Sequence, residues 1–195
     1  MTWLALSCAG ATAAPGGPPG ESYDAELGQW TAKSQLFKGV DKVVDAAATF
    51  QSLAFREARA RRSAELQALP SAAAEALLAS EREEAKGEDD FFMGLSIDPP
   101  SANDLNEKDS VWHVTLLLPD GTVLPALSVR QFYHPDPNLV AIYPYLQRFW
   151  VGYWLRFAAA DASGRRYLAQ GGRVTLRLAS ALGRAELPFE IPRSL

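Results

Sequence analysis

The chain has 195 residues, which is enough for one ordinary domain or for one domain with an extra segment. Hydrophobic residues make up 48% and charged residues 22%, as in a normal soluble globular protein. The formal net charge of −4 argues against a nucleic-acid partner, because phosphate binding needs a concentrated positive field. No apolar run approaches the roughly 18 residues needed to span a bilayer, so we expect no membrane contact except through an anchor.

The first twenty residues combine a short apolar start with a Gly/Pro-rich stretch, the outline of an export signal and linker. Residues 5–8 read Ala-Leu-Ser-Cys, which resembles a bacterial lipobox, where the cysteine is diacylated. Cys8 is the only cysteine, so it cannot form an internal disulfide. We expect residues 1–20 to be an export segment with lipid on Cys8. A cleaved secretion signal and a disordered cytoplasmic start are the alternatives.

Residues 21–90 are predicted to be a helical segment. From about residue 40 to residue 86 the chain is rich in Ala, Glu, Arg, Leu and Gln, which favour helices. Pro70 breaks this run, Ser71 is the predicted N-cap of a second helix, and Gly87 ends it. Apolar residues also recur at steps of three and four over residues 40–54, which predicts an amphipathic helix: Val40, Val43, Val44, Ala47, Phe50 and Ala54.

A short basic cluster lies in this segment. Its arginines could contact acidic lipid or nucleic acid. We favour a solvated helix face, paired in part with Glu57 and Glu65, because the surrounding sequence carries as many acids as bases. The members of the cluster are Arg56, Arg59, Arg61 and Arg62.

Residues 91–195 are predicted to form an antiparallel β domain, because alternation with a period of two replaces the helical spacing. About seven strands in roughly a hundred residues predict an immunoglobulin-like sandwich, with a partly open barrel as the alternative. Pro125 and Pro188 are expected on edge strands, where a missing amide donor costs least. The fold class is therefore α+β. The candidate strands are residues 91–97, 111–118, 123–133, 138–142, 145–157, 173–178 and 185–191, with turns at 119–122, 162–165 and 182–184.

The strand predicted at 145–157 has two different faces. One is apolar and is assigned to the core, with Tyr145, Phe149, Val151, Tyr153, Leu155 and Phe157. The other carries Arg148, Trp150, Gly152, Trp154 and Arg156. Such a row could receive a sugar ring, or an aromatic or acidic side chain of a partner, with Gly152 admitting the ligand to the backbone. Alternatively, the helix predicted at 40–54 covers this face and the tryptophans are packing residues.

The sequence contains no recognised catalytic or cofactor motif. A metal site is not expected, because His113 and His134 are the only histidines and zinc sites draw on several ligands. The sequence therefore predicts a non-enzymatic, cofactor-free bacterial cell-envelope lipoprotein, periplasmic or anchored in the outer membrane, that binds another envelope protein. A hydrolase using His113 or His134 is one alternative. The other is a carbohydrate or peptidoglycan binder that uses Arg148, Trp150, Trp154 and Arg156.

Overall fold

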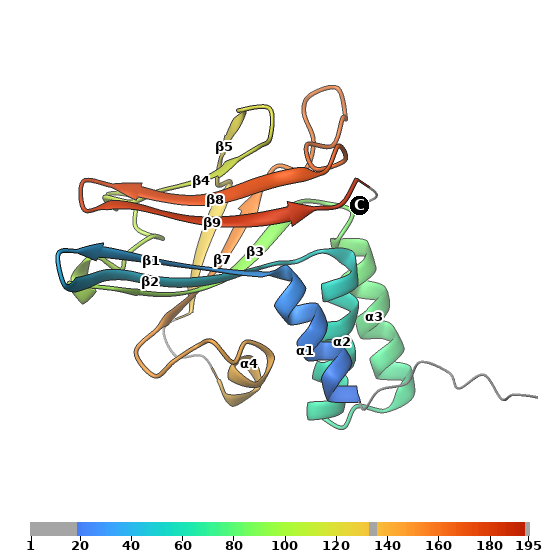
Figure 1. Cartoon of the computed structure of the whole chain (residues 1–195). Coiled ribbons are helices and arrows are strands. Elements are labelled where there is room, and N and C mark those ends of the chain that lie inside the picture. The colour runs from blue at the N-terminus through green and yellow to red at the C-terminus, as the bar shows by residue number, and fades with distance from the viewer. Residues whose placement is uncertain (1–18, 133–135, 194–195) are drawn as a thin grey trace, which may run out of the picture.

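The computed structural model describes residues 19–132 and 136–193 (Figure 1). Cys8 and His134 lie outside these residues. The helices are α1 (Pro19–Trp30), α2 (Leu53–Leu66), α3 (Ser71–Glu84), the short 3-10 helix η1 (Pro100–Ala102) and α4 (Pro137–Ile142). The strands are β1 (Thr31–Lys38), β2 (Asp41–Phe50), β3 (Asp89–Ile97), β4 (His113–Leu117), β5 (Val123–Pro125), β6 (Ser128–Phe132), β7 (Val151–Phe157), β8 (Gly172–Ser180) and β9 (Gly183–Ile191).

The strands form two antiparallel sheets. One has five strands in the order β1-β2-β3-β7-β6, and the other has four in the order β5-β4-β8-β9. This confirms the α+β class and the antiparallel pairing. Pro125 in β5 and Pro188 in β9 both lie on edge strands of the four-stranded sheet, as expected from their missing amide donors.

The two sheets face each other across one core. Phe91 of β3 contacts Phe189 of β9, with ring centroids 5.1 Å apart. Tyr153 and Phe157 of β7 are fully buried, so the predicted core face of this strand is confirmed from residue 151 onward. Phe149 is wrongly assigned to that face. It is 82% exposed, because β7 begins only at Val151 and residues 145–150 form turns and loop.

Helices α1, α2, α3 and α4 gather on the side of the five-stranded sheet that faces away from the other sheet (Figure 1). Phe92 of β3 stacks on Tyr143, with centroids 4.0 Å apart. Phe55 of α2 lies 6.1 Å from Tyr143 and 6.0 Å from Tyr23 of α1, again between ring centroids. These rings join the helical layer to the sheet. None of the helices in the described part of the chain combines the length and apolar character needed to cross a bilayer.

The amphipathic helix predicted at residues 40–54 is wrong, because Asp41–Phe50 is strand β2. The strand pairs with β3, and residues 46–50 are buried on both faces, by the second sheet and by the helical layer. A strand covered on both sides loses its alternation, so its alanine-rich run also fits helical spacing. The predicted helical segment of residues 21–90 is therefore wrong over residues 31–50, which belong to the same sheet as β3 and β7.

Helix boundaries were predicted with mixed success. Helices α2 and α3 are confirmed, as is the break at Pro70. Ser71 is not an N-cap, since Pro70 occupies that position without a side-chain bond. The strand predicted at residues 138–142 is helix α4. Asp136 caps this helix by accepting a 2.9 Å hydrogen bond from the Leu139 amide, and Pro137 suits its first position.

The remaining turns and strands follow local sequence signals. The turn at 119–122 is confirmed, with Gly121 at a φ of +88° and a 2.9 Å bond from the Thr122 amide to Asp120 Oδ1. The β8–β9 hairpin is also confirmed. The return strand predicted at 123–133 is two short strands in different sheets, β5 and β6.

Candidate functional site

A groove of about 430 Å³ lies between the helices α2 and α3 and the strands β6 and β7. On its strand side, Ser128 pairs in register with Arg156, and Arg130 with Trp154. Residues two apart on a strand share a face, so these four side chains form one block. We call this site the Trp154 groove. It is lined by Arg59, Glu81, Glu84, Ser128, Arg130, Trp154 and Arg156.

Trp154 is the aromatic centre of the groove and is only partly buried. The guanidinium carbon of Arg59 lies 5.2 Å from its ring centroid, a cation–π contact. Arg130 lies across the strand pair from Trp154 and is exposed. It contacts the Phe132 ring at 4.7 Å, and no acidic residue in the described ranges pairs with it. Arg130 is therefore a cation available to a ligand beside an accessible indole.

A buried charge network supports the groove from beneath. Arg56 of α2 is completely buried. It donates to Asp90 Oδ2 at 2.6 Å, to Glu81 Oε2 at 3.3 Å and to the Gln51 carbonyl at 3.0 Å. Burying a charge is costly unless it is paired and hydrogen-bonded, and Arg56 meets both conditions. The network thus links α2, α3 and β3 at one point.

The same network holds Arg156 at the edge of the groove. Its Nε donates to Asp90 Oδ1 at 2.9 Å and lies 3.2 Å from Glu88 Oε2. The hydrogen bond to Asp90 raises the pKa of Arg156, which keeps this side chain charged. Asp90 therefore fixes the position of one arginine of the groove while it neutralises Arg56.

Arg59 is fixed in a similar way. Its Nη2 lies 2.5 Å from Glu81 Oε2, and its Nη1 donates to the Tyr143 hydroxyl at 3.5 Å. Burial raises the pKa of Tyr143, whose hydroxyl donates to Gln51 Oε1 at 3.1 Å. The Glu84 side chain is 57% exposed at the rim. The groove thus offers hydrogen-bond donors and acceptors around one indole, which suits non-covalent binding of a polar ligand.

The structure brings together two of the four predicted binding residues, Trp154 and Arg156, and separates the other two. Trp150 is 9% exposed and packs over Gly94, where an added side chain would meet its ring at 2.9 Å. Arg148 is exposed in a turn before β7, with its guanidinium 5.6 Å from the Phe149 ring. The predicted row of five residues is therefore wrong, because β7 does not extend to residue 148.

Gly152 was predicted to let a ligand approach the backbone, and the structure shows that it does not. The ring of Phe92 fills the space beside it, 3.1 Å from the position of an added side-chain carbon. The alternative cover, a helix at residues 40–54, is also wrong. The cover over this face of β7 is partial and comes from α2 and α3, through Arg59 and Glu81.

Sequence reasoning missed the buried position of Arg56 and the half-buried position of Arg59 in the basic cluster. Arg61 and Arg62 pair with Glu57 and Glu65, at 2.8 and 3.5 Å, as predicted for a solvated face. Arg56 and Arg59 instead point toward the sheet and the groove. The signal was present for Arg56, which precedes the buried Ala60 and Ala64 by four and eight residues, the spacing of one helix face.

The predicted hydrolase residues contribute nothing to the groove. His113 is exposed on β4, which belongs to the four-stranded sheet and not to the sheet that lines the groove. His134 lies outside the described residues. Within residues 19–132 and 136–193, no three His, Cys, Asp or Glu side chains gather closely enough to hold a metal ion.

Comparison of the chain with family models, with curated proteins and with solved structures finds no match.

Proposed function

We propose that the protein is a non-enzymatic binding module of the bacterial cell envelope that binds a glycan in the Trp154 groove. The observation that carries this proposal is the partly exposed Trp154 beside Arg130, which has no acidic partner among the described residues. A sugar ring has apolar faces that can lie on an indole, and hydroxyls that both donate and accept hydrogen bonds. Arg156 and Glu84 supply a donor and an acceptor at the rim.

Arg130, which has no acidic partner among the described residues, indicates which class of glycan the groove favours. A guanidinium binds a carboxylate through two parallel hydrogen bonds, with more geometric specificity than a single contact. Arg130 therefore favours a saccharide that carries a carboxylate, as peptidoglycan fragments do. Arg59 and Arg156 are already paired with Glu81 and Asp90, so they position the ligand rather than neutralise it.

Calorimetric titration with soluble peptidoglycan fragments tests this proposal. Trp154→Ala and Arg130→Ala should each weaken binding by about tenfold or more, the effect of losing one stacking or charged contact. Arg148→Ala is the matched control, because Arg148 is also an exposed arginine but lies outside the groove. The proposal fails if the wild-type chain does not bind these fragments, or if the control loses as much affinity as Arg130→Ala.

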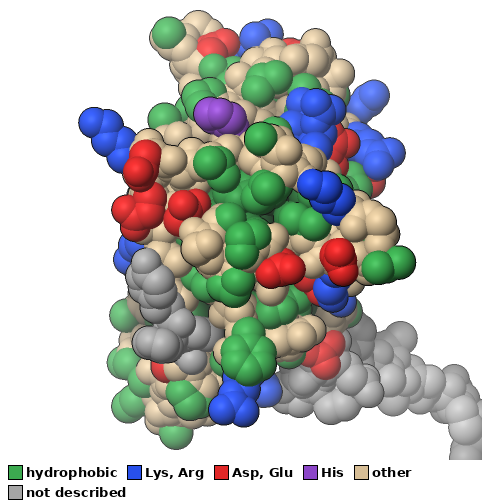
Figure 2. All heavy atoms as spheres, turned by 90° about the vertical axis from the view of Figure 1, so that its left-hand side faces the viewer, with side chains coloured by type: hydrophobic (Ala, Val, Ile, Leu, Met, Phe, Trp, Pro, Cys, Tyr) green, Lys and Arg blue, Asp and Glu red, His purple; other side chains and the backbone are tan. Residues whose placement is uncertain are grey.

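A second candidate function, contact with another envelope protein, is favoured by a different surface. The β1–β2 and β8–β9 turns lie at one end of the molecule (Figure 1). Hydrophobic side chains spread across the middle of this end, with charged side chains around them (Figure 2). Phe37, Val40 and Leu182 are exposed there by 54%, 93% and 37%. A photo-crosslinking residue at position 40 should capture a partner in cells if this surface is used, and one at position 162 should not.

Two further parts of the proposal concern anchoring and fold. Lipid on Cys8 would place the module at the membrane, supported by the lipobox-like residues before it. A fatty-acid label should then mark the wild type and not Cys8→Ser, and absence of label from both would refute the anchor. The immunoglobulin-like form of the two sheets stays a prediction, supported by their antiparallel pairing and shared core.

A further inference from the structure

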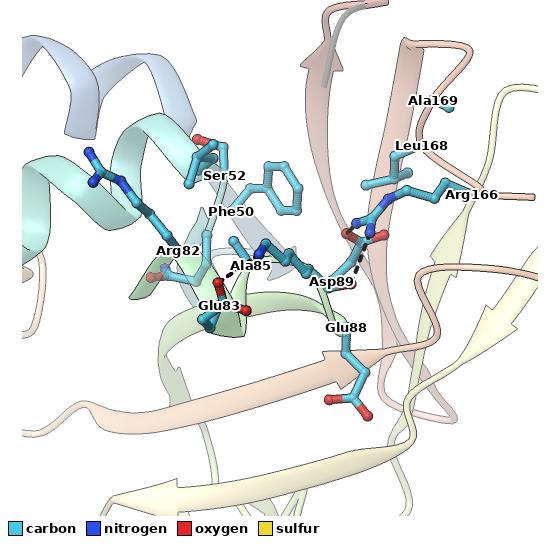
Figure 3. Close-up of a pocket in the computed structure, with 13 residues that line it drawn as sticks. Phe50, Ser52, Arg82, Glu83, Ala85, Glu88, Asp89, Arg166, Leu168 and Ala169 are labelled. Atoms are coloured by element: carbon cyan, nitrogen blue, oxygen red, sulfur yellow. Dashed lines mark hydrogen bonds and ion pairs between the residues drawn. The ribbon is translucent and has the colours of Figure 1, made fainter. Parts of the chain in front are cut away.

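A second cavity, of about 520 Å³, lies where the end of α3 meets the end of β2 and the loop that follows β7 (Figure 3). In Figure 3, Arg82, Glu83 and Ala85 lie on one side of it and Arg166, Leu168 and Ala169 on the other, with Phe50 between. We call this cavity the Asp89 pocket. Its apolar wall is made by Phe50, Leu53, Ala85, Leu168 and Ala169.

The pocket contains a buried carboxylate that is only half satisfied. The Asp89 side chain is 7% exposed. Its Oδ1 accepts a 3.2 Å hydrogen bond from Arg166, but no group in the described part of the chain bonds to its buried Oδ2. Buried polar atoms almost always have a partner, so this unbonded oxygen, which solvent does not reach in the structure, indicates an acceptor that a donor entering the cavity lined by Asp89 would complete. Burial also raises the pKa of Asp89 to about 6.

The cations around the pocket are already paired, which limits the charge of a ligand. Arg82 Nε lies 2.7 Å from Glu57 Oε1, and Lys86 Nζ lies 2.6 Å from Glu83 Oε1. The third cation, Arg166, donates to the Asp89 carboxylate and to the Lys86 carbonyl. An anionic ligand would have to break these pairs, and a cationic one would meet Arg166. A neutral molecule meets neither cost.

We infer that the Asp89 pocket binds a small, neutral, largely apolar molecule that donates one hydroxyl hydrogen bond to Asp89 Oδ2. The apolar wall removes the body of such a molecule from water, and the open oxygen accepts from its hydroxyl. This site is separate from the Trp154 groove. Asp89 and Asp90 are consecutive residues of β3, so their side chains point to opposite faces of the sheet.

Two matched probes test whether the pocket recognises a hydroxyl group on its ligand. The full-length chain is titrated by calorimetry at pH 7.5, where Asp89 is ionised, with 2-naphthol and with 2-methoxynaphthalene. The ether has the same ring system but no donor. We expect 2-naphthol to bind about tenfold or more tightly than the ether, because a hydrogen bond to a charged acceptor is lost. Equal affinities, or no binding of 2-naphthol, would overturn the inference.

Variants locate the site without disturbing the fold. Ala169 is exposed and lines the pocket, so Ala169→Trp should fill it and abolish 2-naphthol binding. Ala162→Trp is the control, an exposed alanine in the neighbouring loop that does not line the pocket. Asp89→Asn should reduce the preference for 2-naphthol over the ether. Unchanged binding by Ala169→Trp would refute the assignment, whereas the peptidoglycan titration should be unaffected by any of these variants.

Discussion

Asp89→Asn is expected to stabilise the protein at pH 7.5 and to leave its stability nearly unchanged at pH 4. Burial raises the pKa of Asp89 from 3.8 to about 6. Between these values the folded protein keeps a proton that the unfolded chain has released, so the free energy of unfolding falls as pH rises. A rise of about two pKa units corresponds to about 3 kcal/mol, complete once the pH is above the folded-state pKa. Asparagine avoids this loss because it never ionises.

Urea unfolding of the wild type and Asp89→Asn across pH 4 to 8 measures this effect directly. The variant should gain up to about 3 kcal/mol at pH 7.5, and the gain should shrink as the pH falls below 6. Asp120→Asn is the control of opposite sign, because the Thr122 amide lowers the pKa of the exposed Asp120. If Asp89→Asn is less stable than the wild type at pH 7.5, the pairing with Arg166 outweighs burial and the reasoning is refuted.

Three other substitutions test the packing. Arg56→Met should lower the free energy of unfolding by about 3–5 kcal/mol, because it removes the 2.6 Å partner of the buried Asp90 Oδ2 and the donor to the Gln51 carbonyl. A loss below about 1 kcal/mol would contradict the network. Gly94→Ala should lower the free energy of unfolding by about 1–3 kcal/mol, since its methyl would lie 2.8 Å from Leu146 and 2.9 Å from Trp150. Displacement of the Trp150 ring should also change the near-UV circular dichroism spectrum. Phe149→Ser should change stability by less than about 0.5 kcal/mol, because Phe149 is 82% exposed, and a larger loss in urea unfolding would show that it packs.

The parts of the fold that sequence predicts well are those determined by neighbouring residues. The turn at Gly121, the break at Pro70 and the edge positions of Pro125 and Pro188 each follow from a residue's own backbone limits. Strand β2 depends instead on distant residues. Its partner β3 lies beyond two helices in the chain, and only their pairing turns an alanine-rich run into a buried strand.

The candidate groove shows the same division. Trp154 and Arg156 alternate on one strand, so their common face was visible in the sequence. Arg59, Glu81 and Arg130 come from three other elements, and nothing local relates them to β7. Extending that strand back to residue 145 placed Trp150 and Arg148 on the same face, because periodicity alone does not show where a strand begins.

The two acids at the start of β3 explain why the open oxygen of Asp89 is informative. Asp90 receives Arg56 and Arg156, and both of its oxygens are bonded. Asp89 occupies the adjacent position and is also buried, yet it receives only Arg166. The same strand end can therefore satisfy a carboxylate completely, and it does so where the acid holds elements together. The neighbour that faces an apolar cavity keeps one acceptor open, as expected of a group that a ligand completes.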